Sequence, residues 1–421
     1  MSSPDDVAPQ HSRGGPGVEW LLLACGVVAA MHVGKLPPAL PVLRQALGTT
    51  LVEAGFLLST VQLGSMLLGL ALGLSAQRLG LKRSLTGGLG LLAVASLAGT
   101  QAGTATGLLA ARAAEGLGVL MVALAAPSLL RRTVPAHRQA LRLGLWGTYM
   151  PMGTGLALLV GPWWLARGDW QGWWIALGLL TAAMAGAAAR VLPADHRPQA
   201  TTATRPHPVL LRATLQQPAP WLLGLCFGAY SAQWLTVIGF LPTIYAEAGL
   251  AAGLAGVLTA LAALANALGN AMGSWLLHRG VAPLRLLWTG FAAMAAGAVV
   301  AFGAQEHLGL PLRYAAILLF SGMGGLVPST LFALSGRACT DARAMPVVVG
   351  LMTQGTGAGQ FLGPPAAAWW AVSQGGWSHT WMATGAAALA GAALAAGLAL
   401  VLRPAHTGPG ATPRRPAGTP K

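Results

Sequence analysis

Three ionisable residues stand inside long apolar stretches of this chain: Lys35, Arg112 and Glu115. An ionised side chain in apolar surroundings is costly, so each of them is a candidate for function. Arg112 and Glu115 are three residues apart and would share one face of a helix. Arg112 could then face a cavity and influence the protonation of Glu115. The alternative is a fixed internal ion pair that holds neighbouring helices together.

His32 and Lys35 form a second polar pair, one helical turn apart. Lys35 could attract an anionic substrate from a cavity wall. Alternatively, its long side chain could extend along the apolar surface and place the ammonium group in water. The positions 201 residues further on are Gln233 and Thr236. Polar pairs at equivalent places predict one cavity-facing stripe in each half of the chain.

Uncharged polar residues within other apolar stretches could hydrogen-bond a substrate. They are Tyr149, Tyr230, Gln233, Trp234, Asn266, Asn270, Gln354 and Gln360. The alternative for each is a hydrogen bond between neighbouring helices, which is commonly worth about 1 kcal/mol or less in a membrane.

The composition indicates a chain surrounded by lipid. Hydrophobic residues make up 55% and charged residues 8%, whereas a soluble domain carries roughly 25% charged residues. The sequence contains no metal-ligand spacing, phosphate-binding loop, dinucleotide fingerprint or pairing of a nucleophile with a base. We therefore predict no enzyme activity, no cofactor and no metal site. The net charge of +15 is spread over short connections, which predicts no nucleic-acid partner.

About 20 apolar residues cross a bilayer, and lipid requires every backbone polar group to pair internally. The sequence therefore predicts an all-α membrane protein with twelve transmembrane helices. The spans are 19–42, 52–74, 84–102, 105–129, 140–165, 171–191, 220–245, 252–276, 284–303, 311–335, 345–372 and 379–402.

Lys and Arg residues crowd the connections on one side of these spans. Only Arg44, Arg167 and Arg313 fall on the other side, and only Lys35 and Arg112 lie well inside spans, away from their ends, out of 25 in all. Cytoplasmic loops are rich in Lys and Arg, so we place both termini in the cytoplasm. Nine Trp residues fall at the outer ends of the spans 140–165, 171–191, 345–372 and 379–402, which predicts an aromatic belt at the membrane interface. They are Trp163, Trp164, Trp170, Trp173, Trp174, Trp369, Trp370, Trp377 and Trp381.

The chain repeats itself. Trp20 and Cys25 match Trp221 and Cys226 at an offset of 201. Later matches follow an offset of 206, which pairs Arg112 with Leu318 and Glu115 with Ser321. A repeat of this length is typical of transporters built from two membrane halves. We predict a tail (1–18), two six-helix bundles (19–192 and 220–403) joined by a linker (193–219), and a second tail (404–421).

The connection between the second and third spans resembles the loop signature of the major facilitator superfamily. The matching residues are Gly73, Arg78, Gly80, Lys82 and Arg83. Gln77 replaces the usual acid there, and Leu81 a usual Arg. Arg112 and Glu115, followed by Gly116, resemble the pattern of the superfamily's fourth helix. Within the superfamily the chain is most similar to the cyanate permease-type branch, through residues 37–44, Pro127-Ser128 with Arg131-Arg132, Gly144-Leu145-Trp146, and residues 350–354 leading to 362–365.

The resemblance implies a secondary transporter with two pseudo-symmetric bundles, alternating access, and coupling to an ion gradient, with protons expected. The cations Lys35 and Arg112 favour a small anionic substrate. We expect a monomer in the cytoplasmic (inner) membrane of a bacterium. Two alternatives stay open: an exporter of drugs or metabolites with the same fold, and a membrane sensor that transports nothing.

Overall fold

The computed structural model describes residues 17–195, 208–339 and 341–402. The predicted tail 404–421, nearly all of the predicted tail 1–18 and the middle of the predicted linker lie outside these ranges. The side chains of residues 75–79, Arg78 among them, are also outside the description.

The first part of the chain forms nine α-helices. They are α1 (Val18–Gly34), α2 (Leu36–Leu47), α3 (Leu51–Ser59), α4 (Leu63–Leu79), α5 (Leu81–Gly99), α6 (Ala105–Thr133), α7 (Ala136–Trp146), α8 (Tyr149–Leu165) and α9 (Trp170–Val191). We call α1 to α9 the N-terminal group.

The second part forms the short helix α10 and the seven helices of what we call the C-terminal group. They are α10 (Pro208–Leu215), α11 (Pro218–Glu247), α12 (Ala252–His278), α13 (Pro283–Ala298), α14 (Leu310–Gly324), α15 (Leu326–Ser335), α16 (Met345–Ser373) and α17 (Thr380–Val401). Short helical turns are η1 (Thr60–Gln62), the π-helical turn η2 (Val299–Gly303), η3 (Gly336–Ala338), η4 (Ala342–Ala344) and η5 (Trp377–His379). The sequence predicts no helix at α10, which falls within the predicted linker.

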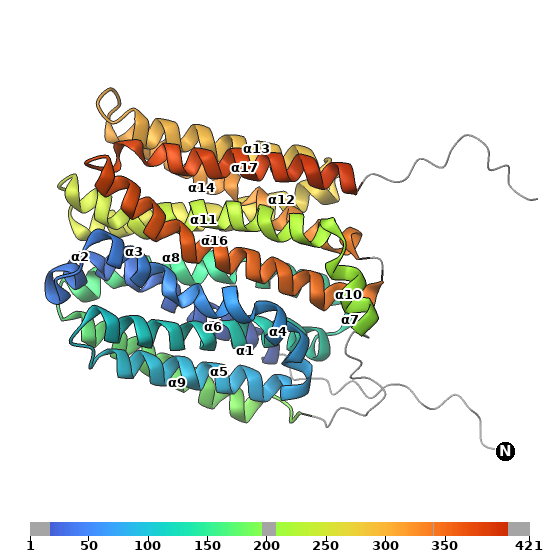
Figure 1. Cartoon of the computed structure of the whole chain (residues 1–421). Coiled ribbons are helices and arrows are strands. Elements are labelled where there is room, and N and C mark those ends of the chain that lie inside the picture. Colours follow the sequence, from blue (N-terminus) through green and yellow to red (C-terminus); the bar gives the residue numbers. More distant parts are fainter. Residues whose placement is uncertain (1–16, 196–207, 340, 403–421) are drawn as a thin grey trace, which may run out of the picture.

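The long helices lie side by side, with the N-terminal group in the lower part of Figure 1 and the C-terminal group in the upper part. The two groups meet where α16 packs along α3 and α4, where α12 packs along α8, and where α11 contacts α2. We call the end at which α2 is joined to α3 the distal end (left in Figure 1), and the end at which α4 is joined to α5 the proximal end.

Nine helical stretches within the described residues are long and apolar enough to cross a membrane. The predicted spans 84–102, 140–165 and 345–372 are not among these nine, although each of them is helical. The span 140–165 is divided at Gly147 and Thr148, which leaves only 17 residues in α8. α5 and α16 contain many Gly and polar residues, which lower their hydropathy.

Two faces of α16 are built from glycines. On one face, a Cβ atom on Gly355 or Gly359 would overlap the backbone of Gly224 or Gly228 in α11. Small residues allow this close approach between backbones, which replaces hydrophobic burial as the source of attraction between helices in lipid. α16 and α11 thus pack backbone against backbone.

The other glycine face of α16 meets the N-terminal group. A Cβ atom on Gly357 would lie 2.5 Å from the Met66 nitrogen, and one on Gly350 would lie 2.9 Å from the Leu70 Cα atom. The same helix therefore holds its own group together with one face and forms the contact between groups with the other.

Candidate functional site

The candidate site begins at a break in the first span. α1 ends at Gly34 and α2 begins at Leu36, so Lys35 lies between them. Pro37 and Pro38 lack the N–H group that would continue the hydrogen bonds of α1 into α2. Side chains of other helices bind carbonyl groups near the break instead. Trp173 Nε1 donates to the Lys35 carbonyl at 3.2 Å, and Arg112 Nη1 donates to the His32 carbonyl at 2.7 Å.

The Lys35 ammonium group is fully buried and uses all three of its N–H donors. It forms an ion pair with Glu115 Oε1 and donates to Ser96 Oγ at 2.9 Å and to His32 Nδ1 at 3.2 Å. It also lies 4.5 Å from the centre of the Trp174 ring, within reach of a cation–π interaction. This burial excludes one of the two interpretations of the sequence, in which Lys35 extends to a membrane interface.

The neighbouring hydroxyl groups fix the tautomer of His32. Thr181 donates its proton to the Leu177 carbonyl at 2.8 Å, so its oxygen can only accept from His32 Nε2, which lies 2.8 Å away. His32 Nε2 therefore carries the hydrogen, and His32 Nδ1 is the acceptor that faces Lys35. With a neutral His32, the three acceptors around Lys35 match the three N–H groups of a charged ammonium group.

Arg112 completes the group. Its Nη1 donates to Glu115 Oε2 at 2.6 Å, and its Nε donates to the Leu57 carbonyl at 3.3 Å. Its Nη2 has no hydrogen-bond partner among the described residues, although the side chain is fully buried. We call His32, Lys35, Arg112 and Glu115 the cationic cluster, because two cations and one carboxylate leave one surplus positive charge.

All the partners of the cationic cluster come from the N-terminal group. Leu57 lies on α3, Ser96 on α5, and Trp174 and Thr181 on α9. The sequence interpretation did not single out Ser96 or Thr181, although Thr181 is the one hydroxyl side chain of the span 171–191 and Ser96 has apolar neighbours on both sides. It assigned Trp173 and Trp174 to an interfacial belt, whereas the structure buries both beside Lys35.

The other predicted members of the belt are divided between surface and interior. Trp163 and Trp369 are more than half exposed, as an interfacial position requires. Trp170 and Trp377 are buried and contact other aromatic rings. The belt interpretation is therefore wrong for Trp170, Trp377 and the two Trp residues beside Lys35, because sequence position gives the depth of a ring but not the side of the helix it faces.

The C-terminal group holds an uncharged network at the corresponding place. The Tyr230 hydroxyl and the Asn266 side chain hydrogen-bond each other, and Asn266 Nδ2 also donates to the Ser321 carbonyl at 2.8 Å. Trp234 Nε1 donates to Ser321 Oγ at 3.2 Å. Ser321 is the repeat partner of Glu115. Equivalent positions are therefore occupied by a charged cluster in the N-terminal group and by an uncharged network in the C-terminal group.

The structure disperses the other predicted site residues. Gln354 Nε2 donates to the Met66 carbonyl at 3.2 Å and links α16 to α4, whereas Asn270 Nδ2 lies 3.5 Å from the Gly147 carbonyl. Tyr149 stacks on Trp146, with the ring centres 4.3 Å apart. Gln360 is buried on α16. These residues hold helices together or pack against neighbours, and they do not join the cationic cluster.

Several buried polar atoms have no hydrogen-bond partner among the described residues and belong to helices that contact the other group. They are Gln62 Nε2 in η1, Gln233 Oε1 and Thr236 Oγ1 in α11, and Thr356 Oγ1 in α16. We call them the free interface atoms. The two groups are in contact here, because α16 packs against η1 and a Cβ atom on Gly239 of α11 would lie 3.1 Å from Leu58 of α3. Within the C-terminal group, Ser231 Oγ donates to the Thr356 carbonyl at 3.1 Å. The sequence interpretation missed Gln62 and Thr356, though a lone Gln inside the span 52–74 is a detectable signal.

The two groups contact each other at the distal end. Arg44 Nη1 of α2 lies 3.9 Å from Glu247 Oε1 at the end of α11. The other carboxylate oxygen of Glu247 accepts a hydrogen bond of 2.8 Å from Trp377 Nε1. An exposed ion pair of this length contributes about 0–1 kcal/mol, so it can open reversibly.

The loop signature lies at the proximal end, where Asp195 supplies an anchor that the sequence interpretation missed. Gly80 takes φ +84°, and a side chain there would collide with the Asp195 carboxylate. Asp195 accepts hydrogen bonds from the backbone N–H groups of Lys82 at 2.9 Å and Arg83 at 3.0 Å. The N–H groups in the first turn of a helix have no partner within the helix, so Asp195, which follows α9, caps the start of α5. Gly73 lies on α4 near Gly350.

We expect Asp195→Ala to destabilise the protein by about 1 kcal/mol, the usual cost of removing a helix cap. Thermal unfolding of the purified protein in detergent would measure the change. Arg83→Ala is the matched control, because its side chain is exposed and its backbone N–H group remains. An Asp195→Ala protein as stable as the control would contradict the capping role.

Comparison with known proteins places the chain in a family. The family model of the Major Facilitator Superfamily matches residues 22–345. The cyanate transport protein CynX of Escherichia coli is 31% identical over 242 residues, and the methylenomycin A resistance protein of Streptomyces coelicolor is 35% identical over 158 residues. These matches cover 55% and 37% of this chain, and only 59% and 33% of the two relatives.

Solved structures share the fold. A D-xylose–proton symporter superposes with a TM-score of 0.72 at 15% identity, covering 90% of this chain and 96% of the other. A bacterial homologue of the lysosomal transporter Spinster, in an inward-facing and occupied conformation, superposes with a TM-score of 0.67 at 15% identity, covering 91% and 94%.

These comparisons confirm the predicted all-α membrane fold of twelve helices and the resemblance on which it rests. The family match and the transport proteins among the relatives point to membrane transport. The chain therefore belongs to the Major Facilitator Superfamily of membrane transporters.

Proposed function

We propose that this transporter moves a small anion across the cytoplasmic membrane of a bacterium by alternating access. The surplus positive charge of the cationic cluster carries the proposal. Lys35 and Arg112 contribute two charges, and Glu115 cancels one of them. An uncompensated buried charge is costly, and a bound anion would compensate it. We place the distal end outside the cell, because Lys and Arg crowd the proximal connections.

Arg112 is the group that we assign to the anion. Its Nε and Nη1 are held by backbone carbonyls of two helices and by Glu115, which leaves Nη2 as the free donor. A guanidinium group that is already oriented loses little conformational freedom when it binds an anion. Lys35 has no free donor, so its role is to set the charge and to position Glu115.

The free interface atoms would serve the uncharged part of the substrate. They include one amide N–H donor on Gln62, one carbonyl acceptor on Gln233 and two hydroxyl groups. They belong to both groups of helices, so a substrate held between them would touch both halves. A buried polar group without a partner costs about 1–3 kcal/mol, which a hydrogen bond from the substrate would recover.

Alternating access is supported by the contacts of the distal end. Arg44 and Glu247 belong to different groups, so the distal end can open only if this ion pair separates. The pair is partly exposed and weak, which suits a contact that must form and break in every cycle. In the described conformation the two groups are in contact on the distal side.

Proton coupling would reside in Glu115, the acid of the cationic cluster. Protonation of Glu115 would raise the surplus charge of the cluster from about one to about two, because Lys35 and Arg112 keep theirs. An anion would then bind more tightly, and by reciprocity the bound anion would favour protonation. This linkage moves proton and anion in the same direction, which is symport.

Export is the second candidate function, and the likeness to the methylenomycin A resistance protein favours it. Direction separates the two candidates. An exporter accumulates its substrate in inverted membrane vesicles, whereas an importer accumulates it in right-side-out vesicles. A proton gradient of defined sign across the same vesicles then distinguishes symport from exchange.

Uptake into proteoliposomes tests the anion proposal. Small monovalent anions, with cyanate first because of the relative named above, would be screened with and without a protonophore. For the anion that is transported, we expect Arg112→Gln to raise the apparent KM about tenfold or more, since a hydrogen bond to a charged group is worth about 1.5–3 kcal/mol. Arg112→Lys should recover part of the loss.

The control is Arg167→Gln, which removes an Arg from the distal surface, where it stacks on Trp163. Its KM should equal that of the unmodified protein. An Arg112→Gln protein that folds normally and keeps its KM would rule out Arg112 as the anion-binding group. Transport of neutral or cationic solutes alone would rule out the anion proposal itself.

A further inference from the structure

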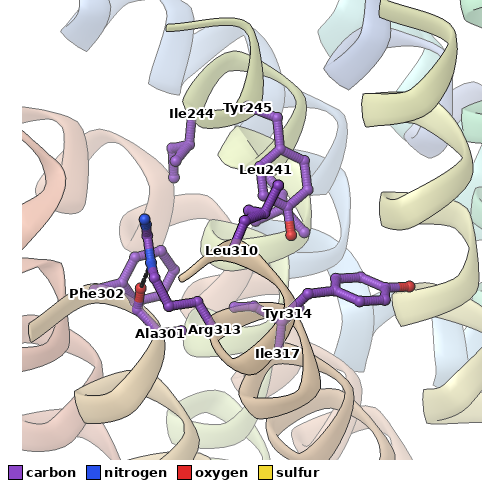
Figure 2. Close-up of a pocket in the computed structure, with 9 residues that line it drawn as sticks. All are labelled: Leu241, Ile244, Tyr245, Ala301, Phe302, Leu310, Arg313, Tyr314 and Ile317. Carbon is purple, nitrogen blue, oxygen red and sulfur yellow. Dashed lines mark hydrogen bonds between the residues drawn. The ribbon is translucent and has the colours of Figure 1, made fainter. Parts of the chain in front are cut away.

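Of the three Arg residues at the distal end, Arg44 is the one that pairs across the two groups of helices. Arg167 stacks on a Trp ring of α8, within the N-terminal group. Arg313 lines a small pocket of the C-terminal group, where its Nε donates a hydrogen bond of 2.9 Å to the Ala301 carbonyl, drawn as a dashed line in Figure 2. Arg44 instead faces Glu247 of the opposite group, where α2 contacts α11.

The pair between Arg44 and Glu247 is unequal. The closest atoms, Arg44 Nη1 and Glu247 Oε1, are 3.9 Å apart, which is too long for a hydrogen bond. Arg44 Nε is buried and has no hydrogen-bond partner among the described residues. The other oxygen of Glu247 accepts a hydrogen bond of 2.8 Å from Trp377 Nε1. Loss of the pair would therefore leave Glu247 with a partner and Arg44 without one.

α2 joins Arg44 to the cationic cluster. Lys35 precedes α2 and Arg44 lies in its last turn, about 14 Å further along the helix at 1.5 Å per residue. Pro37 and Pro38 remove two N–H groups that would otherwise tie α2 to α1. α2 can therefore tilt relative to α1 more easily than one part of an unbroken helix could. It carries one cation at each end, Lys35 in the cluster and Arg44 at the distal surface.

We propose that Arg44 is the residue that first binds the substrate anion at the distal surface, and that the anion separates α2 from α11 by taking the place of Glu247. The inference rests on the proposed function, in which the substrate is a small anion. The Arg44 side chain is 33% exposed, so a small anion can reach it without a preformed cavity.

The strengths of the two interactions favour the anion over Glu247. An exposed ion pair changes an equilibrium by about fivefold or less. A hydrogen bond to a charged group changes an equilibrium by about tenfold or more. A small anion can approach the guanidinium group of Arg44 to hydrogen-bond distance, whereas Glu247 stays at 3.9 Å. The anion is therefore the better partner.

This exchange of partners would make distal opening depend on the substrate. Without an anion, the ion pair holds α2 against α11. With an anion on Arg44, Glu247 remains bound to Trp377, and α2 is free to tilt at the break beside Lys35. Arg44 would then act before Arg112, and each of the two has a buried N–H group without a partner among the described residues.

Two variants that remove the same ion pair test the proposal, because they should change uptake differently. Uptake into right-side-out membrane vesicles is measured with cyanate as the probe, or with nitrate if cyanate is not taken up. Arg44→Gln should raise the KM for the external anion about tenfold. Glu247→Gln should leave the KM the same or lower it by up to about fivefold, because it removes the competitor and keeps Arg44. Arg44→Lys should recover part of the loss.

Spin labels measure the separation of α2 from α11. Gln45→Cys and Ala246→Cys place one label on an exposed position of each helix, and Cys339→Ser removes the native cysteine that is not buried. Pulsed EPR of the labelled protein in nanodiscs should give a longer distance when the transported anion, cyanate or nitrate, is added. Urea, a small neutral molecule, should leave the distance unchanged. Glu247→Gln should give the longer distance without any anion.

Two kinds of result would overturn the proposal. An equal rise of the KM in Arg44→Gln and Glu247→Gln would show that the two residues act only as a structural pair. An unchanged KM in Arg44→Gln, or a helix separation that does not respond to the transported anion, would show that Arg44 does not receive it. Arg167→Gln is the matched control for the loss of a distal Arg and should keep its KM.

These failures differ from failure of the proposed function. That failure would appear as uptake of no anion by the unmodified protein, or as a KM that does not depend on Arg112, and it would overturn this inference as well. A KM that depends on Arg112 but changes alike in Arg44→Gln and Glu247→Gln would overturn the role of Arg44 alone.

Discussion

Glu115→Gln is expected to destabilise the protein by about 3–5 kcal/mol, the cost of removing one partner from a buried ion pair. Glu115 carries the negative charge of the cationic cluster, and its two carboxylate oxygens bind Lys35 and Arg112. Gln has nearly the same shape but no charge. The variant would therefore hold two fully buried cations with no counter-ion.

The double variant Lys35→Met/Glu115→Gln tests whether charge is the cause. Met has a similar length to Lys but no charge. In the double variant Arg112 is therefore the one charged residue of the cluster, and the net charge of the cluster returns to +1. We expect it to be more stable than Glu115→Gln alone, by about 1–3 kcal/mol of coupling between residues in contact. Thermal unfolding in one detergent, compared across the single and double variants, gives this coupling.

The opposite result is informative. If the double variant is less stable than Glu115→Gln, the Lys35 side chain contributes packing and hydrogen bonds to Ser96 and His32 that outweigh its charge. The assignment of a surplus charge to the cluster would then fail, and with it the main support for an anionic substrate.

Gly359→Val is expected to cost about 3 kcal/mol and to lower the yield of folded protein. A Cβ atom at position 359 would overlap the Gly228 carbonyl and would also lie 2.8 Å from Ser231 Oγ. A carbonyl group belongs to the backbone of α11 and cannot move unless that helix moves. Overpacking of this kind typically costs about 1–3 kcal/mol, and a rigid neighbour places the value at the upper end.

Gly385→Val is the control for this variant. Gly385 lies on α17, and a Cβ atom there would have no neighbour within 4 Å. The same change in helix propensity therefore occurs without a clash. Fluorescence-detected size-exclusion chromatography and thermal unfolding would compare the two variants. Equal stability of the two would show that α16 and α11 do not depend on this close approach.

The residues of α6 show how far the sequence could predict the candidate site. The three-residue spacing of Arg112 and Glu115 predicts one helix face, and the structure joins these two side chains at 2.6 Å. Helical spacing is a local property, so the sequence determines it. The partners of the pair are His32 of α1, Lys35 at the break that follows it and Leu57 of α3, and no local pattern indicates that these residues face the pair.

His32 and Lys35 illustrate the same limit. Their spacing predicts a shared face, and the structure places both in the cationic cluster. From the sequence, Lys35 could lie either in a cavity wall or at a membrane interface. The choice depends on Ser96, Trp174 and Thr181, which lie 61 to 149 positions from their partners along the chain.

The sequence by itself determined the helices, the repeat and the family. The reason is that the length of an apolar stretch, its glycine content and the loop signature are properties of residues that are neighbours in the chain. Only the tertiary structure decided that Lys35 is buried, that Asp195 caps α5, and that Arg44 faces Glu247. The physical reason is that lipid attracts every apolar face of a helix equally. Contacts between helices therefore depend on close packing and on a few polar partners, and these are set by residues far apart in the chain.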